Sequence, residues 1–565
     1  MKLLFYLITL YTLMISIVFN SAYGKNVNFN YNANNLSNYF SALISFDDYD
    51  YLKSQEFFKK IKDNQKDHTS QSSKHIKSLI SLNKYTEAEQ YSRRLENKKR
   101  SNFESRLILG LYEFKTGNFR KAHTYFDQLD KNLDNRMVFN ILKKSLINWT
   151  RIDELNEETN FLNIENIPDR YNNFKTIQTM LAHCFFDTSS TNDMFKKISE
   201  NQKNNFSRYH FFHANYLQNR GDKLEAKAII NNASGKHPKN LLINQFKKTL
   251  NNNEKNFNKF DCKNKNHILA ELFYVISNAL SVQGSYEISN FYINLSKYMN
   301  PNFQSYNSLE AENFFILGKY EKSKKIYKEL VNIGTIYKWY SDTQISFILD
   351  EQGKEKEAIT FLTKSYYSIK PNIYQTFDFA NFLNNREQYK KSVELYSNIL
   401  SQIKQSHKLY PKVLDRRGTA YERLKKWDLA EKDLLLSLEI SPNQAYVMNY
   451  LAYTWLENGE NFQEALKMLE KANELKKDDG FITDSLGWAL YKLNRFAEAK
   501  EFLRKAIIIM PSDPIVNDHF ADCLWRNNKK IQARYYWNYV LNLDSTKEDL
   551  RKNIENKLIF GLEKI

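Results

Sequence analysis

A repeat with a period close to 34 residues constrains the fold of this chain more than any other feature of its sequence. Each clear copy has a small residue, a second small residue twelve positions later, a large apolar residue, a third small residue and a closing proline. Two copies with identical spacings are Gly487, Ala499, Leu503, Ala506 and Pro511, and Gly418, Ala430, Leu434, Ser437 and Pro442. Self-similarity at such a period is typical of a stacked array of one supersecondary unit.

The register extends over most of the chain. Ala521 and Ala533 continue it after Gly487, and Ala452 and Ala465 fill the preceding interval with one inserted residue. Weaker copies of the twelve-residue step are Ala380/Ser392, Ser346/Ala358, Ala311/Ser323, Ser277/Ser289, Ala214/Ala226, Gly110/Ala122, Ile76/Ala88 and Ala42/Ser54. Residues 137–206 and 241–269 are too diverged to be placed.

The pattern predicts pairs of closely packed helices. Small side chains at two sites let helix backbones approach each other, and a closing proline ends the second helix. Large residues sixteen positions after the first small site, such as Phe126 and Trp537, are expected to fill the gap toward the next hairpin. A single hairpin cannot bury its own apolar face, whereas a stack of hairpins can. With only 14 Gly and 8 Pro in 565 residues, the chain also has few turn-formers. We therefore predict an all-α solenoid.

The small residues and the closing proline at Gly487, Ala499, Ala506 and Pro511 resemble the consensus of the tetratricopeptide repeat (TPR) family. The resemblance implies a right-handed superhelix of helix-turn-helix repeats that binds proteins on its concave face and carries no catalytic activity. The segments 483–491 and 517–522 also resemble exported TPR proteins of alphaproteobacteria.

The strength of the pattern divides the chain. Residues 35–269 are predicted to form degenerate repeats, 270–410 intermediate repeats, 411–547 well-formed repeats and 548–565 a helical cap. Before them, Lys2, the uncharged run from Leu3 to Phe19 and a small residue at Gly24 indicate a signal peptide over 1–24, followed by a linker over 25–34. We expect cleavage after Gly24 and a location in the periplasm or cell envelope. The alternative is that this N-terminal segment is retained as an inner-membrane anchor. We expect no other contact of the chain with a membrane.

Family positions that point into the concave groove define the candidate site. In the last three repeats these positions hold aromatic residues interleaved with carboxylates. Exposed Trp, Tyr and Arg side chains are typical of protein-binding hot spots, so these positions are candidates for partner binding. The candidate partner-binding residues are Tyr446, Asn449, Tyr453, Asp484, Trp488, Tyr491, Asp518, Asp522, Trp525 and Arg526, and Leu456, Glu457, Phe481, Lys492 and Ile515 occupy the remaining groove positions. The alternative is that Trp488, Tyr491 and Trp525 pack between neighbouring repeats.

Charge in the candidate groove indicates the kind of partner. The whole chain has a formal net charge of +17, but residues 445–525 hold nine Lys and Arg against thirteen Asp and Glu, a local net of −4. One groove position in four successive repeats holds Asp415, Asn449, Asp484 and Asp518, three of which would repel a C-terminal carboxylate. A protein or peptide partner that is basic or neutral therefore fits better than an acidic tail.

Other functions find little support in the sequence. We find no phosphate-binding glycine loop, no nucleophile elbow and no basic block typical of a nucleic-acid site, and we expect neither an enzyme nor a cofactor. His210 and His213 have metal-ligand spacing but fall at core positions of a repeat. Three cysteines, Cys184, Cys262 and Cys523, are too few and too scattered to indicate a disulfide framework, and Cys523 is expected to be buried.

Three functions remain open at this stage. The leading hypothesis is a non-catalytic scaffold of the cell envelope that holds a protein partner in the groove. The alternatives are a non-catalytic subunit of an envelope enzyme complex, such as a protease or glycan-processing system, and a binder of anionic envelope glycan through the basic upstream half.

Overall fold

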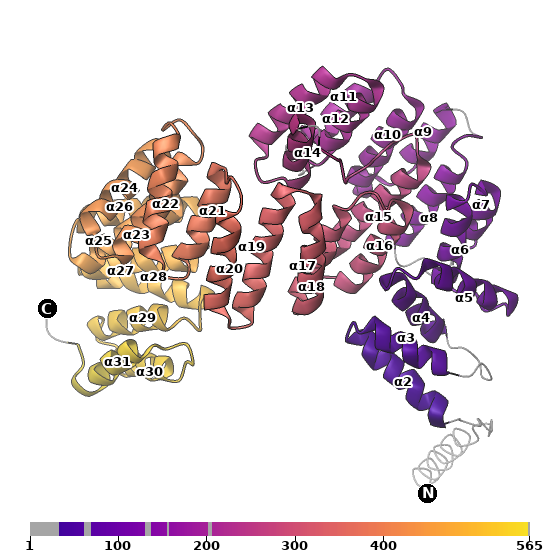
Figure 1. The fold of residues 1–565 in the computed structure, drawn as a ribbon. Coiled ribbons are helices and arrows are strands. Elements are labelled where there is room, and N and C mark those ends of the chain that lie inside the picture. Colours follow the sequence, from indigo (N-terminus) through magenta and orange to yellow (C-terminus); the bar gives the residue numbers. More distant parts are fainter. Residues whose placement is uncertain are drawn as a thin grey trace, which may run out of the picture. The chain divides into compact units, whose positions relative to one another are not determined.

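The computed structural model describes residues 33–61, 69–129, 137–154, 157–201, 206–252 and 254–562. These residues form thirty α-helices joined by short turns, and no β-strand lies among them (Figure 1). The only strand-like pairing in this part of the chain is an isolated bridge between Asn258 and Phe303. The prediction of an all-α array of helical hairpins is confirmed.

The chain divides into two compact units, residues 1–348 and 349–565. The first contains α2 (Ala33–Asp47), α3 (Tyr51–Lys60), α4 (Thr69–Ser81), α5 (Tyr85–Asn97), α6 (Phe103–Lys115), α7 (Phe119–Asp127), α8 (Met137–Thr150), α9 (Glu157–Glu165), α10 (Asn172–Phe186), α11 (Thr191–Ser199), α12 (Tyr209–Arg220), α13 (Lys223–Lys236), α14 (Leu241–Asn252), α15 (Lys265–Val282), α16 (Tyr286–Met299), α17 (Tyr306–Ile316), α18 (Tyr320–Leu330) and most of α19 (Thr335–Glu351).

The second unit contains the best-preserved repeats. Its helices are α20 (Glu355–Tyr367), α21 (Ile373–Asn384), α22 (Tyr389–Gln402), α23 (Tyr410–Arg423), α24 (Trp427–Ile440), α25 (Ala445–Asn458), α26 (Phe462–Leu475), α27 (Gly480–Lys492), α28 (Phe496–Ile509), α29 (Pro514–Arg526), α30 (Lys530–Leu541) and α31 (Glu548–Phe560). The last of these lies where a helical cap was predicted.

The small residues of the repeat lie where the two helices of a hairpin touch. A Cβ added to Gly487 would lie 2.7 Å from Leu503 Cγ, and one added to Gly418 would lie 3.0 Å from Leu434 Cγ. In both hairpins the contacting residue is the large one sixteen positions later. That residue therefore packs back onto the small site of its own hairpin, in addition to any contact with the next hairpin that we had expected.

Serine at the second small site forms a hydrogen bond that alanine cannot form. The hydroxyls of Ser54, Ser289 and Ser323 each donate to a backbone carbonyl twelve residues earlier, at distances of 3.0, 2.8 and 2.8 Å. The three serines are fully buried. A buried hydroxyl without a partner is costly, so this bond makes serine compatible with the close contact between the helices. Serine can therefore replace alanine at the second small site of the weaker upstream repeats.

Turns between the paired helices require a left-handed backbone conformation. Asn494 and Asn528 have φ angles of 59° and 61°, and Gly459 has a φ angle of 78°. Asparagine and glycine tolerate this region better than other residues, which explains why they occur in hairpin turns of this glycine-poor chain.

The two stretches that could not be placed are also helical. Helices α8 to α11 occupy most of 137–206, α14 occupies 241–252, and residues 254–264 form an irregular segment. A disulfide joins them, linking Cys184 in α10 to Cys262 in the irregular segment with a Cα–Cα distance of 5.8 Å. Our expectation that these cysteines have no disulfide role was wrong. Both lie where the repeat register was lost, and 78 residues separate them, so nothing in the sequence indicated that they meet.

Among the described residues, no helix has the length and apolar character needed to cross a membrane. The predicted signal peptide and nearly all of the linker lie outside the described residues, so cleavage after Gly24 stays a prediction.

Candidate functional site

The candidate site lies on the first helices of three successive repeats. Helices α25, α27 and α29 are the first helices of the last three hairpins, and each packs against the next. At the second position of these helices, Tyr446, Phe481 and Ile515 expose 59%, 59% and 44% of their surface. We call these three exposed residues, which occupy one position in three successive repeats, the apolar row; the Tyr446 hydroxyl donates to Asp479 at 2.9 Å.

The aromatic residues predicted deeper in the groove do not form an open ladder. Trp488 and Tyr491 are buried and stack on each other with ring centroids 4.6 Å apart. On α29, the His519 ring stacks on Trp488 at 3.9 Å. Trp488 Nε1 also donates to Glu457 Oε1 on α25 at 2.8 Å. These two rings therefore pack between neighbouring repeats, as the alternative interpretation of the sequence held.

Trp525 and Arg526 at the end of α29 are half-buried. The Trp525 ring lies 5.3 Å from the Trp537 ring of α30. On its other side it lies against Gly561, where a Cβ would come within 2.2 Å of the ring. Because Gly561 also has a φ angle of 74°, glycine is required there for two reasons, and the segment after α31 closes over Trp525.

Asp484 is buried and paired with a histidine of the next repeat. His519 Nδ1 lies 2.8 Å from Asp484 Oδ2. Burial alone would lower the pKa of His519, but the carboxylates of Asp484, Asp518 and Asp522 outweigh it and raise that pKa above its ordinary value. The imidazole therefore compensates a carboxylate that the sequence analysis had assigned to the groove surface.

Asp518 and Asp522 are also buried, and they hold a lysine from the C-terminal helix. Lys557 Nζ of α31 donates to both oxygens of each carboxylate at 2.8–2.9 Å, and Trp537 Nε1 donates to Asp522 Oδ1 at 3.0 Å. Burial, with a further contribution from the Asp518 charge, raises the pKa of Asp522 to about 6. Lys557 thus offsets one of the two negative charges on α29.

Sequence reasoning missed His519 and Lys557 as the cations of this site. A signal for both was present, because His519 follows Asp484 by 35 residues and Lys557 follows Asp522 by 35 residues. Each of these cations thus lies one residue beyond a 34-residue period from its acid, His519 on the next first helix and Lys557 on the helix that follows the last hairpin.

Two acceptors of the groove lack a donor within the described chain. Asp484 Oδ1 is buried without a hydrogen-bond partner, and the same holds for Asn449 Oδ1 one repeat earlier. Asp484 is only 5% exposed. Tyr453, the candidate residue between them in the sequence pattern, is half-buried, and its ring centroid lies 6.3 Å from that of His519.

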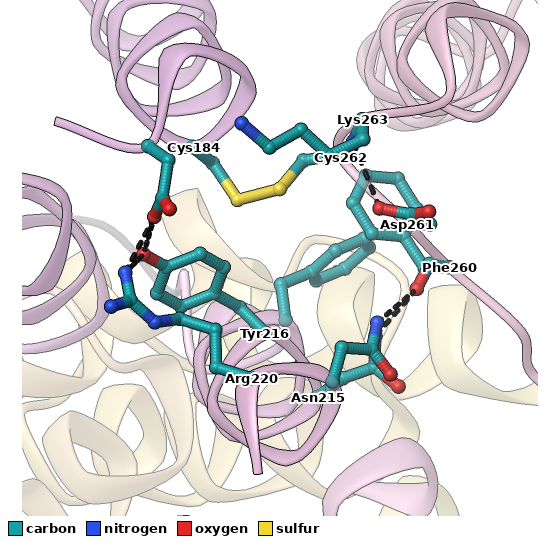
Figure 2. Close-up of a pocket in the computed structure, with 11 residues that line it drawn as sticks. Cys184, Asn215, Tyr216, Arg220, Phe260, Asp261, Cys262 and Lys263 are labelled. Carbon is teal, nitrogen blue, oxygen red and sulfur yellow. Dashed lines mark hydrogen bonds and ion pairs between the residues drawn. A yellow bond between two sulfur atoms is a disulfide. The ribbon is translucent and has the colours of Figure 1, made fainter. Parts of the chain in front are cut away.

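A cavity lies in the first unit, beside the disulfide. It has a volume of about 250 Å³ and is lined by both cysteines, Tyr216 and Arg220 of α12, and Lys263 (Figure 2). Its polar groups satisfy one another: Arg220 donates to Asp187 at 2.6 Å, and Lys263 donates to the Phe185 carbonyl at 2.6 Å. The cavity therefore presents few uncommitted polar groups to a ligand.

The two histidines with metal-ligand spacing lie in the core. His213 stacks on Phe195 at 5.0 Å and its Nε2 lies 3.1 Å from Asn192 Oδ1. Burial lowers the pKa of both His210 and His213 to about 4. No group of residues suited to a metal ion occurs in the described part of the chain. Cys523 is buried, as expected.

Comparison with known proteins finds a match to one repeat of the C-terminal unit. Residues 482–510, which include most of α27 and all of α28, match the family model described as tetratricopeptide repeat. The matched residues contain the Gly487–Ala499–Ala506 register from which the TPR resemblance was drawn.

One stretch of the chain is similar to a curated bacterial protein. A TPR repeat-containing protein of Pseudomonas aeruginosa, PA4667, is 32% identical over 124 residues, and the match covers 21% of this chain and 20% of that relative. The chain thus spans about a fifth of that relative's length, and neither its activity nor its partners transfer from it.

Solved structures with similar folds have low sequence identity. The Cut9–Hcn1 hetero-tetramer of APC/C is 13% identical, covers 94% of this chain and 97% of its own, and has a TM-score of 0.38. A tetratricopeptide repeat protein from Parabacteroides merdae is 15% identical, covers 51% of this chain and 97% of its own, and has a TM-score of 0.33. Neither similarity indicates a function for this chain.

Proposed function

We propose that this TPR protein is a non-catalytic scaffold of the bacterial cell envelope, and that it binds a protein or peptide partner across the first helices of its last three repeats. TPR arrays are protein-binding folds, which makes a scaffold the coarse function of the chain. The observation that carries the finer proposal is the apolar row. Tyr446, Phe481 and Ile515 are exposed at the same position in three successive repeats, where scattered exposure would need no explanation.

The charge beside the apolar row supports a basic or neutral partner. Asn449, Asp484 and Asp518 each follow a member of the row by three residues, so they lie on the same side of their helices, one turn further along. Lys557 offsets one of the two charges of Asp518 and Asp522, and Asp484 and Asn449 each retain an acceptor oxygen without a donor. An acidic partner would meet repulsion here and a basic one would not.

Export is supported by two independent features. The N-terminal 24 residues have the pattern of a signal peptide, and Cys184 and Cys262 form a disulfide. Structural disulfides persist in oxidising compartments such as the periplasm and are rare in reducing ones.

Two measurements test the location. N-terminal sequencing of the natural protein should find a chain that begins at or near Lys25. A fusion to alkaline phosphatase, which is active only outside the cytoplasm, should be active. An intact Met1 on a membrane-embedded protein would refute cleavage, and an inactive fusion would refute export.

The binding site is tested by placing a photo-reactive phenylalanine analogue at Phe481 in cells. Phe481 is exposed, so the analogue should leave the fold intact and form a covalent adduct with one main partner. A chain that forms no adduct from any position of the apolar row would refute the proposed function.

A further inference from the structure

The apolar row and the hydrogen-bond acceptors beside it together indicate what kind of partner segment would fit this surface. Resting on the proposed function, we propose that the partner segment is a basic amphipathic helix that places apolar side chains on Tyr446, Phe481 and Ile515 and a lysine or arginine on Asp484. Lys557 already bonds to the acid pair Asp518–Asp522, and His519 already pairs with Asp484 Oδ2, so Asp484 Oδ1 is the carboxylate oxygen of these three acids that still lacks a donor.

Lys557 shows the chemistry of such a contact. It reaches Asp518 and Asp522 from a helix, α31, and its ammonium bonds to four carboxylate oxygens within 2.9 Å. Three donors on an ammonium group suit a site with several acceptor oxygens. The inner face of these repeats therefore already holds a lysine presented by a helix, one repeat beyond Asp484.

The unpartnered oxygen of Asp484 is the second, independent observation. His519 satisfies only Oδ2, and Oδ1 remains buried without a donor. A buried acceptor left unsatisfied is unfavourable, and hydrogen bonds to charged groups are among the strongest that proteins form. A cationic donor that reaches Asp484 Oδ1 would remove this penalty, with Asn449 Oδ1 as a neighbouring acceptor on α25.

Tyr453 lies one turn after Asn449 on α25, and its half-buried ring lies 6.3 Å from that of His519. Burial raises the pKa of Tyr453, and the charges of Glu457, Asp484 and Asp518 raise it further. The proposal includes a rotation of this side chain that admits the lysine or arginine to Asp484.

The spacing of the repeats favours a helix as the bound conformation. First helices of adjacent hairpins that pack directly lie roughly 8–10 Å apart. Seven residues of an α-helix span about 10.5 Å and return to nearly the same face. Two or four residues of a β-strand span about 6.6 or 13 Å, so a strand meets successive helices of the stack less regularly.

The probe for this proposal is a synthetic helix-forming peptide of about three heptads. It carries leucine at one position of each heptad and lysine three positions later, and it is labelled with a fluorophore. A matched peptide replaces each lysine by glutamate. Fluorescence anisotropy with the mature chain, residues 25–565, should show binding of the lysine peptide and at least about tenfold weaker binding of the glutamate peptide.

Variants of the protein test the two acceptors in opposite directions. Asp484→Asn should weaken binding of the lysine peptide about tenfold, since it removes the charge that the lysine meets. Asn449→Asp should strengthen it by about the same factor, a gain that damage to the fold cannot mimic. Glu474→Gln, a substitution at an exposed carboxylate on the second helix of the same repeat, is the matched control and should leave binding unchanged.

Some outcomes would overturn this proposal alone. Equal binding of the lysine and glutamate peptides, or an Asn449→Asp variant that does not bind more tightly, would show that the partner is not a basic helix. If the natural partner cross-linked through Phe481 has no basic amphipathic segment at the cross-linked site, this inference fails while the proposed function stands. If no adduct forms, the proposed function itself fails.

Discussion

The lysine that α31 inserts between two carboxylates provides a sharp test of how the C-terminal repeats are held together. In Lys557→Ala, Asp518 and Asp522 lose the cation that neutralises them while they remain covered by α31. All three side chains are about nine-tenths buried. Removing one partner of a buried ion pair costs about 3–5 kcal/mol, because the remaining charge is left without compensation.

Release of α31 limits that cost. The helix is terminal and buries only Ile554 completely, so it can detach and let water reach the carboxylates. We therefore expect the free energy of local opening of α31 to fall by about 3 kcal/mol. This corresponds to about a hundredfold faster hydrogen exchange of the α31 amides. Helices α20 to α24 should exchange as before.

A neighbouring lysine supplies the control. Lys552 pairs with Glu548 at 3.9 Å on the exposed side of the same helix. Lys552→Ala should change the exchange of α31 by less than about threefold, since exposed pairs contribute little. Adding Asp518→Asn to Lys557→Ala should restore part of the protection. Unchanged exchange in Lys557→Ala would refute the reasoning, because it would show that the carboxylates are not compensated by this lysine.

Three further predictions follow from buried groups elsewhere. Ala499→Glu should destabilise the second unit by about 3–5 kcal/mol, since it forces a charged side chain into the contact between α27 and α28, and an unchanged denaturation midpoint would show that the register is wrong in this repeat. Cys184→Ser combined with Cys262→Ser should destabilise the first unit by about 2–4 kcal/mol in urea unfolding, and a thiol reductant should destabilise the natural chain but not this variant; equal sensitivity of both would contradict a structural disulfide. The raised pKa of His519 means that its ion pair with Asp484 stabilises the fold below pH 6.5 and is lost as the pH rises through the folded pKa, so the second unit should be more stable at pH 6.5 than at pH 8.5, and His519→Gln should remove most of that difference.

Much of the fold follows from the spacing of small residues. The contact at Gly487 and Leu503 depends on residues sixteen apart in one hairpin, and a local contact of this kind leaves a pattern in the sequence. The serine-to-carbonyl bonds across twelve residues are local in the same sense. The 34-residue period then implies stacking, because equivalent faces of successive hairpins must cover each other.

The candidate site was harder to predict because exposure depends on the neighbouring repeats. Trp488 occupies a groove position by sequence, yet His519 of the next repeat covers it. Lys557 belongs to a helix outside the repeat pattern, so its place on Asp518 and Asp522 could be found only by searching one period beyond each acid. The disulfide joins two diverged stretches, and no local pattern connects Cys184 to Cys262.

We propose that partners bind across the apolar row on the first helices of the last three repeats. The most direct measurement compares photo-cross-linking in cells from two exposed aromatic positions, Phe481 on α27 and Tyr535 on α30. Both side chains are largely exposed, so the same analogue is tolerated at either site. We expect one dominant adduct from Phe481 and none of that mass from Tyr535. The same adduct from Tyr535 with none from Phe481 would contradict it, because the partner would then lie on the second helices.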